Sequence, residues 1–157
     1  MNISWQGLSS FHISSKNTDK EASLVIDPYD NKTGLRFPRS LEADIVLSSH
    51  NEEDANNISA IQGEPFVINS AGEYEIKGVF VFAIPASLKG EGKRENLPHL
   101  IFRIESEGMQ LAHLGALDRE LTDEELQELN NIDILMIPAG NNRVMSPKVA
   151  AKVIGQI

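Results

Sequence analysis

Two short apolar runs constrain the fold more than any other feature of the sequence: Asp44–Ser48 (DIVLS) and Ile132–Pro138 (IDILMIP). A strand without alternation between apolar and polar residues is typical of a position that is covered on both faces of a sheet. Each run leads directly into a polar segment, which for the first run is Ser49–Asn57. The chain is therefore predicted to bury two strands and to release a polar loop from the end of each.

Shorter strands and hairpins surround these two runs. The dipeptides Lys77-Gly78 and Glu107-Gly108 predict tight turns, and the polar stretch Ser15–Glu21 separates two of the early strands. Asp27-Pro28 ends the third strand, because proline cannot continue a ladder of hydrogen bonds. The expected strands are Ile3–Gln6, Phe11–Ser14, Ser23–Ile26, Phe66–Ile68, the hairpin Gly72–Ile84, and the hairpin of Leu100–Ile104 with Met109–His113.

Two helices have clear start signals. Thr122 followed by Glu125 forms a capping-box pattern, which predicts a helix over Asp123–Leu129. Ser146-Pro147 opens a second helix over Lys148–Ile157, with serine as the cap and proline where its missing N–H costs nothing. We therefore predict a sandwich of mixed sheets flanked by helices. The remaining segments are a short helix at Ile58–Ile61 and surface loops at Asp30–Ser40 and Ser87–Pro98.

Composition narrows the class of protein. A length of 157 residues is that of one domain, and the formal charge of 14 minus 23, or −9, makes nucleic acid a poor partner. The longest apolar runs are far shorter than the ~20 residues that cross a membrane, and the first ten residues do not have the pattern of a signal peptide. With no cysteine in the chain, we expect a cytoplasmic protein without disulfides or thiolate metal sites.

Six segments, in order along the chain, resemble motifs of the metallo-β-lactamase superfamily, and in particular its L-ascorbate-6-phosphate-lactonase-like branch of Zn-dependent hydrolases. The resemblance implies an α/β (α+β) fold, an αββα sandwich of mixed β-sheets flanked by helices. It covers residues 1–157 as a single domain that ends before the last strand and helix of the family fold. The matching segments are Trp5–Ile13 (WQGLSSFHI), Ile26–Pro28 (IDP), Val46–Asn57 (VLSSHNEEDANN), Gly72–Pro85 (GEYEIKGVFVFAIP), His113–Gly115 (HLG) and Asp133–Gly140 (DILMIPAG).

The family's metal loop is only partly retained. The resemblance places His50 at the first histidine of the loop and Asp54 at the aspartate that binds the second metal and orients the attacking water. Glu52 replaces the second histidine, and Ala55 replaces the histidine next to the aspartate. Of these four positions, two keep the family residue, and a third, Glu52, carries another possible ligand.

The more distant ligand positions have changed as well. In the segment PASLK, Leu88 stands at a histidine position of the family and Lys89 at an aspartate position. Ala116 replaces the aspartate that bridges the two metals, and the final histidine of the family would lie beyond Ile157. Because a catalytic zinc needs three protein ligands and a water, we expect a non-catalytic binding or assembly module with no cofactor. We also expect a homo-oligomer, or a protein partner that covers an open sheet edge, and neither membrane nor nucleic acid as a partner.

Two alternatives stay open. The first is an enzyme, a metal-dependent hydrolase of a lactone or a phosphoester, with zinc or another divalent metal on a remodelled site of His50, Glu52 and Asp54. The second is a sensor that binds a small molecule in the vestigial pocket.

Further polar residues have two interpretations each. Lys89 could pair with the carboxylates of Asp54 and Glu52 and supply part of a missing metal's charge, or it could be an exposed loop lysine. His113 could orient the floor of the pocket by hydrogen bonding or pack in the core, and Asp27 could support the ligands from behind or form a turn. His12 and His99 are interpreted as surface residues of strands or loops.

Overall fold

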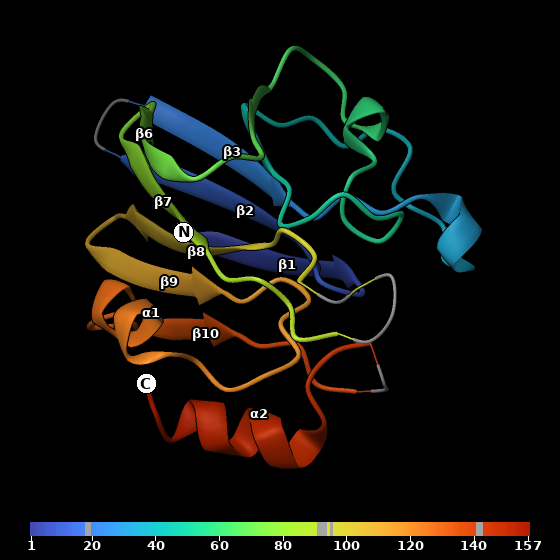
Figure 1. Ribbon diagram of the computed structural model, residues 1–157. Helices are drawn as coiled ribbons and strands as arrows, with labels where there is room; N and C mark the ends of the chain where they lie inside the picture. The colour runs from blue at the N-terminus through green and yellow to red at the C-terminus, as the bar shows by residue number, and fades with distance from the viewer. Residues whose placement is uncertain (18–19, 91–93, 95, 141–142) are drawn as a thin grey trace.

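The computed structural model describes residues 1–17, 20–90, 94, 96–140 and 143–157, which form two packed five-stranded sheets (Figure 1). The strand order is β1-β2-β3-β4-β5 in the first sheet and β10-β9-β8-β7-β6 in the second. This arrangement confirms the predicted sandwich of mixed sheets.

Within the first sheet, the β1–β2 and β2–β3 pairs are antiparallel, whereas β3, β4 and β5 run parallel to one another. The parallel strands bring their C-terminal ends to the same end of the sandwich. The strands of this sheet are β1 (Asn2–Gly7), β2 (Ser10–Asn17), β3 (Lys20–Ile26), β4 (Ile45–Leu47) and β5 (Phe66–Ile68).

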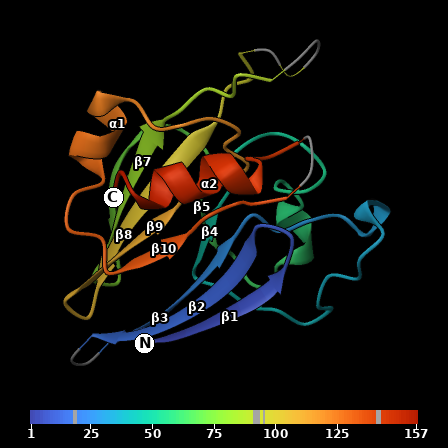
Figure 2. The ribbon, with the colours of Figure 1, turned by 90° about the horizontal axis from the view of Figure 1, so that it is seen from below.

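The second sheet is an antiparallel meander with one parallel strand, β10, added beside β9. Its strands are β6 (Gly72–Ile76), β7 (Val79–Pro85), β8 (Leu100–Ser106), β9 (Met109–His113) and β10 (Ile134–Met136). The helices α1 (Asp123–Glu128) and α2 (Pro147–Ile154) lie beside this sheet, next to β9 and β10 (Figures 1 and 2). Two 3-10 turns, Asn31–Thr33 and Ile58–Ala60, follow β3 and β4 along the chain.

Three apolar clusters hold these layers together. The first fills the space between the two sheets and includes Leu24, Leu47 and Phe102, all completely buried. The second lies between the second sheet and the helices, and the third covers the outer face of the first sheet with Tyr29 and Phe37 from the segment after β3. That outer face is thus covered by loops and 3-10 turns.

Most local expectations are confirmed, with shifts at element ends, but β10 is not the fully buried strand that was expected, since it ends its sheet and Ile134 and Leu135 are half-buried. The strands β2 and β3 extend into the polar stretch Ser15–Glu21, which was expected to separate them, and residues 18 and 19 of that stretch lie outside the described part. Polar side chains can enter a strand here because they find partners, as when the buried Ser15 hydroxyl bonds the Ser106 hydroxyl at 2.5 Å. The expected loop Ser87–Pro98 contains residues 91–93 and 95, which are also outside that part.

The helix starts follow the sequence signals closely. Thr122 accepts from the backbone of Glu125, and the Glu125 side chain accepts from the backbone of Thr122, so that the capping box is formed at α1. Ser146 accepts from the backbone of Val149 at the start of α2. Among the described residues, no helix combines the length and the apolar character needed to cross a membrane.

Candidate functional site

Several polar side chains meet at the end of the sandwich where the parallel strands terminate. Asp27 follows β3, the segment Ser48–His50 follows β4, and His113 is the last residue of β9. His99 precedes β8, which is antiparallel to β9 and therefore starts at this end. The candidate site thus draws on both sheets, although its residues are up to 86 positions apart (27 to 113).

His50 lies at the centre of the candidate site, with a side chain that is 0% exposed. Its Nε2 atom is 3.1 Å from Asp54 Oδ1 and 3.4 Å from Glu52 Oε2. The three possible ligand atoms all lie within 4.8 Å of one another. The structure therefore brings together the three residues that the sequence singled out as candidate metal ligands.

A tight turn after β4 creates this convergence. The backbone N–H groups of Ala55 and Asn56 both donate to the carbonyl of Glu52, at 3.1 Å each, which directs the side chains of Glu52 and Asp54 back toward His50. The turn is tied to the segment after β3, since Asn57 donates its backbone N–H to Pro28 at 2.7 Å.

Behind His50, a chain of hydrogen bonds leads to the buried Asp27. Ser49 donates its backbone N–H and its hydroxyl to the two carboxylate oxygens of Asp27, at 2.7 Å each, and the Ser49 hydroxyl is 2.9 Å from His50 Nδ1. Burial raises the pKa of Asp27, opposed by the charges of His113 and His50 and by the Ser49 hydrogen bonds. Asp27 also has a left-handed backbone (φ 47°). It therefore has both expected roles, because it forms a turn and also supports His50 through Ser49.

Two arginines that the sequence did not single out bind Glu52. Arg94 places Nε in a hydrogen bond with Glu52 Oε2 at 2.9 Å, and its Nη2 lies 2.9 Å from the same oxygen without hydrogen-bond geometry. Arg143 Nη2 is 3.2 Å from the other oxygen, Oε1. Arg94 also donates from Nη1 to the Arg143 carbonyl at 2.7 Å, which links the two segments. Each oxygen of the Glu52 carboxylate thus has a guanidinium partner.

These charges also affect Asp54. Burial raises the pKa of the Asp54 carboxyl, but the hydrogen bond with His50 and the charges of His50 and Arg143 outweigh burial and hold the pKa below its usual range. Asp54 is therefore a carboxylate at neutral pH and pairs with its neighbours.

The hypothesis that Lys89 pairs with these carboxylates is wrong. Its side chain is exposed, and it makes no ion pair within 4.0 Å of Glu52 or Asp54, all three being described residues. The neighbouring Leu88 is buried in the second apolar cluster, and Asp118 holds the Lys89 backbone N–H at 2.8 Å. Because Leu88 takes the inward position, Lys89 points outward, and the arginines supply the positive charge instead.

The interpretation of His99 as a surface residue is also wrong, since it is only 3% exposed. Its ring centroid lies 5.6 Å from that of His50. Burial, followed by the charge of His50, lowers the pKa of His99 to about 3. The ring is therefore neutral, with Nδ1 donating to the Ala86 carbonyl at 3.0 Å and Nε2 accepting from the Ala116 N–H at 3.0 Å. Both nitrogens are used, so His99 is not available as a metal ligand.

His113 is engaged in the same way. Burial lowers its pKa, although the charge of Asp27 and a hydrogen bond to Ser9 raise it. Nε2 bonds the Ser9 carbonyl at 2.7 Å, and Nδ1 accepts from the Gly115 N–H at 3.1 Å. Gly115 has a left-handed backbone (φ 55°), and a Cβ there would lie 2.4 Å from His99 Nε2. Because Gly115 has no side chain, the backbone after His113 can pack closely against the His99 ring.

The donor set does not fit the metal ions of the family. Ala55, Leu88 and Ala116, which the motif resemblance places at ligand positions of the family, are all buried and apolar. Among the described residues, only His50, Glu52 and Asp54 form a group of three possible ligands. Since both oxygens of Glu52 are already paired with guanidinium groups, the residues present do not fit one metal ion, and still less two.

A cavity of about 520 Å³ adjoins the other side of His50. The described residues that line it include no acidic residue, lysine or arginine, and their hydrogen-bonding groups come mainly from serines and asparagines. These are Ser48, Ser49, Asn51, Asn56, Asn69, Ser70 and Ser87, with the rings of His50 and His99.

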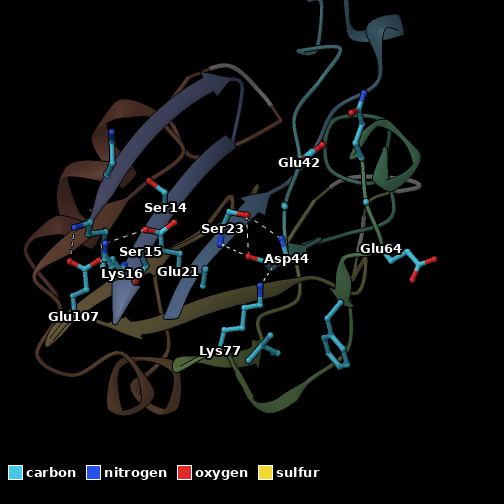
Figure 3. Close-up of a pocket in the computed structure, with 18 residues that line it drawn as sticks. Ser14, Ser15, Lys16, Glu21, Ser23, Glu42, Asp44, Glu64, Lys77 and Glu107 are labelled. Atoms are coloured by element: carbon cyan, nitrogen blue, oxygen red, sulfur yellow. Dashed lines mark hydrogen bonds and ion pairs between the residues drawn. The ribbon is translucent and has the colours of Figure 1, made fainter. Parts of the chain in front are cut away.

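A larger groove, of about 940 Å³, lies at the opposite end of the sandwich (Figure 3). At its centre, Asp44 precedes β4 and accepts from the Ser23 backbone at 2.9 Å and from Lys77 Nζ at 2.6 Å. Its charges are largely paired within the protein, and it does not include His50, Glu52 or Asp54.

Comparisons with known proteins agree with this fold. The family model described as "Beta-lactamase superfamily domain" matches residues 2–157. A metal-dependent hydrolase of Thermococcus onnurineus (strain NA1) is 27% identical over 158 residues, covering 83% of this chain and 70% of the relative.

Two solved structures extend the comparison. A protein of Thermotoga maritima, a candidate Zn-dependent hydrolase of the metallo-beta-lactamase superfamily, is 28% identical with a TM-score of 0.77, covering 98% of this chain and 69% of the other. A candidate metal-dependent hydrolase from Parabacteroides distasonis is 20% identical with a TM-score of 0.70, covering 98% of this chain and 76% of the other. At that identity the second likeness shows the fold alone.

Proposed function

This chain belongs to the metallo-β-lactamase superfamily and is similar to its Zn-dependent hydrolases, and from that premise we propose that it is a non-catalytic member that binds a small molecule. Its place in the lactonase-like branch remains a prediction from the sequence motifs.

One observation carries the proposal: the Glu52 carboxylate is bound by two guanidinium groups. Arg94 and Arg143 place their positive charge on Glu52, the residue that stands at a histidine position of the metal loop in the motif resemblance. Loss of metal ions would leave the half-buried acids Glu52 and Asp54 uncompensated, which is unfavourable, and pairing with arginine reduces that cost. The site is stable as an ion-pair network without a cation from solution.

The missing chemistry follows from the missing donors. In zinc hydrolases the ion supplies a hydroxide at neutral pH by lowering the pKa of bound water to about 7. A zinc site that does this needs three protein ligands and an open position. Here Glu52 is paired with arginine, and the buried Ala55 and Ala116 have no donor atoms in their side chains.

The cavity beside His50 supplies the binding function. Its volume of about 520 Å³ lies within the range of about 300–1,000 Å³ that is usual for small-molecule sites. The described part of the lining offers hydroxyl, amide and imidazole groups, which suit an uncharged ligand with several hydrogen-bonding groups, such as a polyol or a sugar. A phosphorylated ligand would find no lysine or arginine among the described residues of this lining.

Metal content and ligand binding test the proposal together. After dialysis against Zn²⁺ or Mn²⁺ and then against buffer, elemental analysis is expected to find well below one ion per chain, with no difference between the native protein and His50→Ala. Thermal denaturation with a panel of sugars and their phosphates is expected to show stabilisation by uncharged members. One or more retained ions that His50→Ala removes would contradict the proposal.

A metal-dependent hydrolase is the second candidate, because His50, Glu52 and Asp54 offer three ligand atoms within 4.8 Å. Hydrolysis of a lactone or phosphoester that depends on added metal, and that Asp54→Asn abolishes, would support it. Activity that persists in Asp54→Asn would point to a contaminant.

We also propose that a second copy or a protein partner pairs with one of the strands that end the two sheets. These strands are β1, β5, β6 and β10. An exposed strand edge has unpaired backbone N–H and C=O groups that favour such pairing. The side chain of Trp5 on β1 is 68% exposed and can report contact at that edge.

A further inference from the structure

We propose that Arg94 and Arg143 block a latent site for one divalent metal ion at His50, Glu52 and Asp54, so that removal of the guanidinium groups allows a metal to bind. This inference rests on the proposed function, because it requires that the native protein does not hold the ion.

The spacing of the donors supports a latent site. Ligand atoms about 2.0–2.2 Å from a tetrahedral zinc ion are about 3.3–3.6 Å apart. His50 Nε2 lies 3.1 Å from Asp54 Oδ1 and 3.4 Å from Glu52 Oε2. The turn after β4 therefore holds two carboxylate oxygens near metal-binding separations from His50 Nε2, and all three donor atoms lie within 4.8 Å of one another.

The orientation of His50 also suits a ligand. Its Nδ1 atom is held by the Ser49 hydroxyl at 2.9 Å, and Ser49 is in turn bonded to the buried Asp27. A hydrogen bond to one ring nitrogen fixes the orientation of a histidine whose other nitrogen binds a metal. The supporting contacts behind His50 are thus intact.

Arg94 blocks this arrangement most directly. Its Nε and Nη2 atoms both lie 2.9 Å from Glu52 Oε2, the same oxygen that faces His50. A metal ion bound to that oxygen would lie close to the guanidinium and be repelled by its charge. The Arg94 side chain is only 17% exposed, so it cannot easily move aside into water.

Arg143 contributes less than Arg94 to blocking the metal site. It approaches the other oxygen of Glu52 at 3.2 Å, and its side chain is 57% exposed. Screening by solvent reduces the charge effect of an exposed group. We therefore expect the loss of Arg94 to matter more than the loss of Arg143.

Cobalt titration of folded variants tests the proposal. Co²⁺ binding is followed by visible absorption, and Zn²⁺ binding by competition, in the native protein, Arg94→Met, Arg143→Met and the double variant. Arg103→Met is the matched control, because Arg103 is similarly buried (12% exposed side chain) but pairs with Glu105 and stacks on Phe82.

In the double variant we expect affinity for Zn²⁺ to rise on the order of 100-fold over the native protein, the upper range of effects on metal affinity from groups around the ligands. Arg143→Met alone should give a rise of roughly 10-fold. Arg103→Met should leave the affinity unchanged, and adding His50→Ala to the double variant should remove the gain.

The outcomes separate the two proposals. Tight binding by the native protein would contradict the proposed function. No gain in a folded double variant, or a gain that survives His50→Ala, would overturn the blocked-site inference and leave the proposed function standing. If the double variant does not fold, the absence of a gain in Arg143→Met overturns the inference, because Arg143 is largely exposed.

Discussion

Acidification from pH 7.5 to pH 5 is expected to destabilise this protein mainly through His99. The folded state holds the ring neutral, because Nε2 accepts a hydrogen bond from the Ala116 N–H and burial penalises the charge. Protonation of His99 Nε2 would place its N–H group against the N–H group of Ala116. In the unfolded chain no such constraint exists, so the ring takes up a proton there first.

The sign and size follow from the two pKa values. The pKa is about 3 in the folded state and about 6.5 when unperturbed, so the stabilisation is complete above pH 6.5 and is lost as the pH falls toward 3. One pH unit corresponds to about 1.4 kcal/mol, so the 1.5 units below 6.5 cost about 2 kcal/mol of unfolding free energy at pH 5. His113, whose pKa is also lowered, adds in the same direction, and Asp27, whose pKa is raised, opposes it.

Urea denaturation at both pH values measures this loss. In His99→Gln the loss between pH 7.5 and pH 5 is expected to shrink by about 2 kcal/mol relative to the native protein, whatever the starting stability of the variant. Thr122→Ala, which is destabilised without loss of a histidine, controls for lower starting stability. An equal loss in His99→Gln and the native protein would refute the argument that the fold holds this ring neutral.

Three further predictions concern the frame of the site. Thr122→Ala removes the hydroxyl half of the capping box with Glu125 and is expected to cost about 1 kcal/mol in thermal denaturation, and no change would show that the cap is dispensable. Gly115→Ala combines a left-handed backbone with a Cβ 2.4 Å from His99 Nε2, so the unfolding free energy is expected to fall by about 2–4 kcal/mol. An unchanged stability would mean that the backbone around Gly115 can shift to accommodate the methyl group. Trp5 is the single tryptophan and is exposed on β1. If β1 pairs between two copies, the fluorescence emission of Trp5 is expected to shift to shorter wavelength as the protein concentration rises. A dimer detected by sedimentation without that shift would place the contact at another strand.

The regular elements were predictable because their signals are local. Turn residues such as Lys77-Gly78 act within a few positions, and both form a left-handed turn in the structure. The Thr122–Glu125 box likewise acts within one helical turn. The ends of β2 and β3 were placed less well, because cross-strand pairing, rather than their own polar sequence, extends those strands.

The candidate site was predictable only in part. The convergence of His50, Glu52 and Asp54 could be anticipated because the three residues share one short loop, and that loop resembles the metal loop of the family. The burial of His99 had a weak signal, its position directly before the apolar strand β8. Nothing nearby in sequence indicated its partners Ala86 and Ala116.

The sequence by itself determined the strand and helix pattern and the sandwich, whereas the loss of ligand types at Ala55, Leu88 and Ala116 stays a prediction from the motif resemblance. Only the tertiary structure decided which cations neutralise the loop, since Arg94 and Arg143 reach Glu52 from 42 and 91 positions away. The physical reason is that secondary structure responds to neighbours along the chain, whereas charge pairing in a buried site depends on which distant segments the packed sheets bring together. Lys89 stands at an aspartate position of the family in the motif resemblance, but it faces solvent because the neighbouring Leu88 packs into the second apolar cluster.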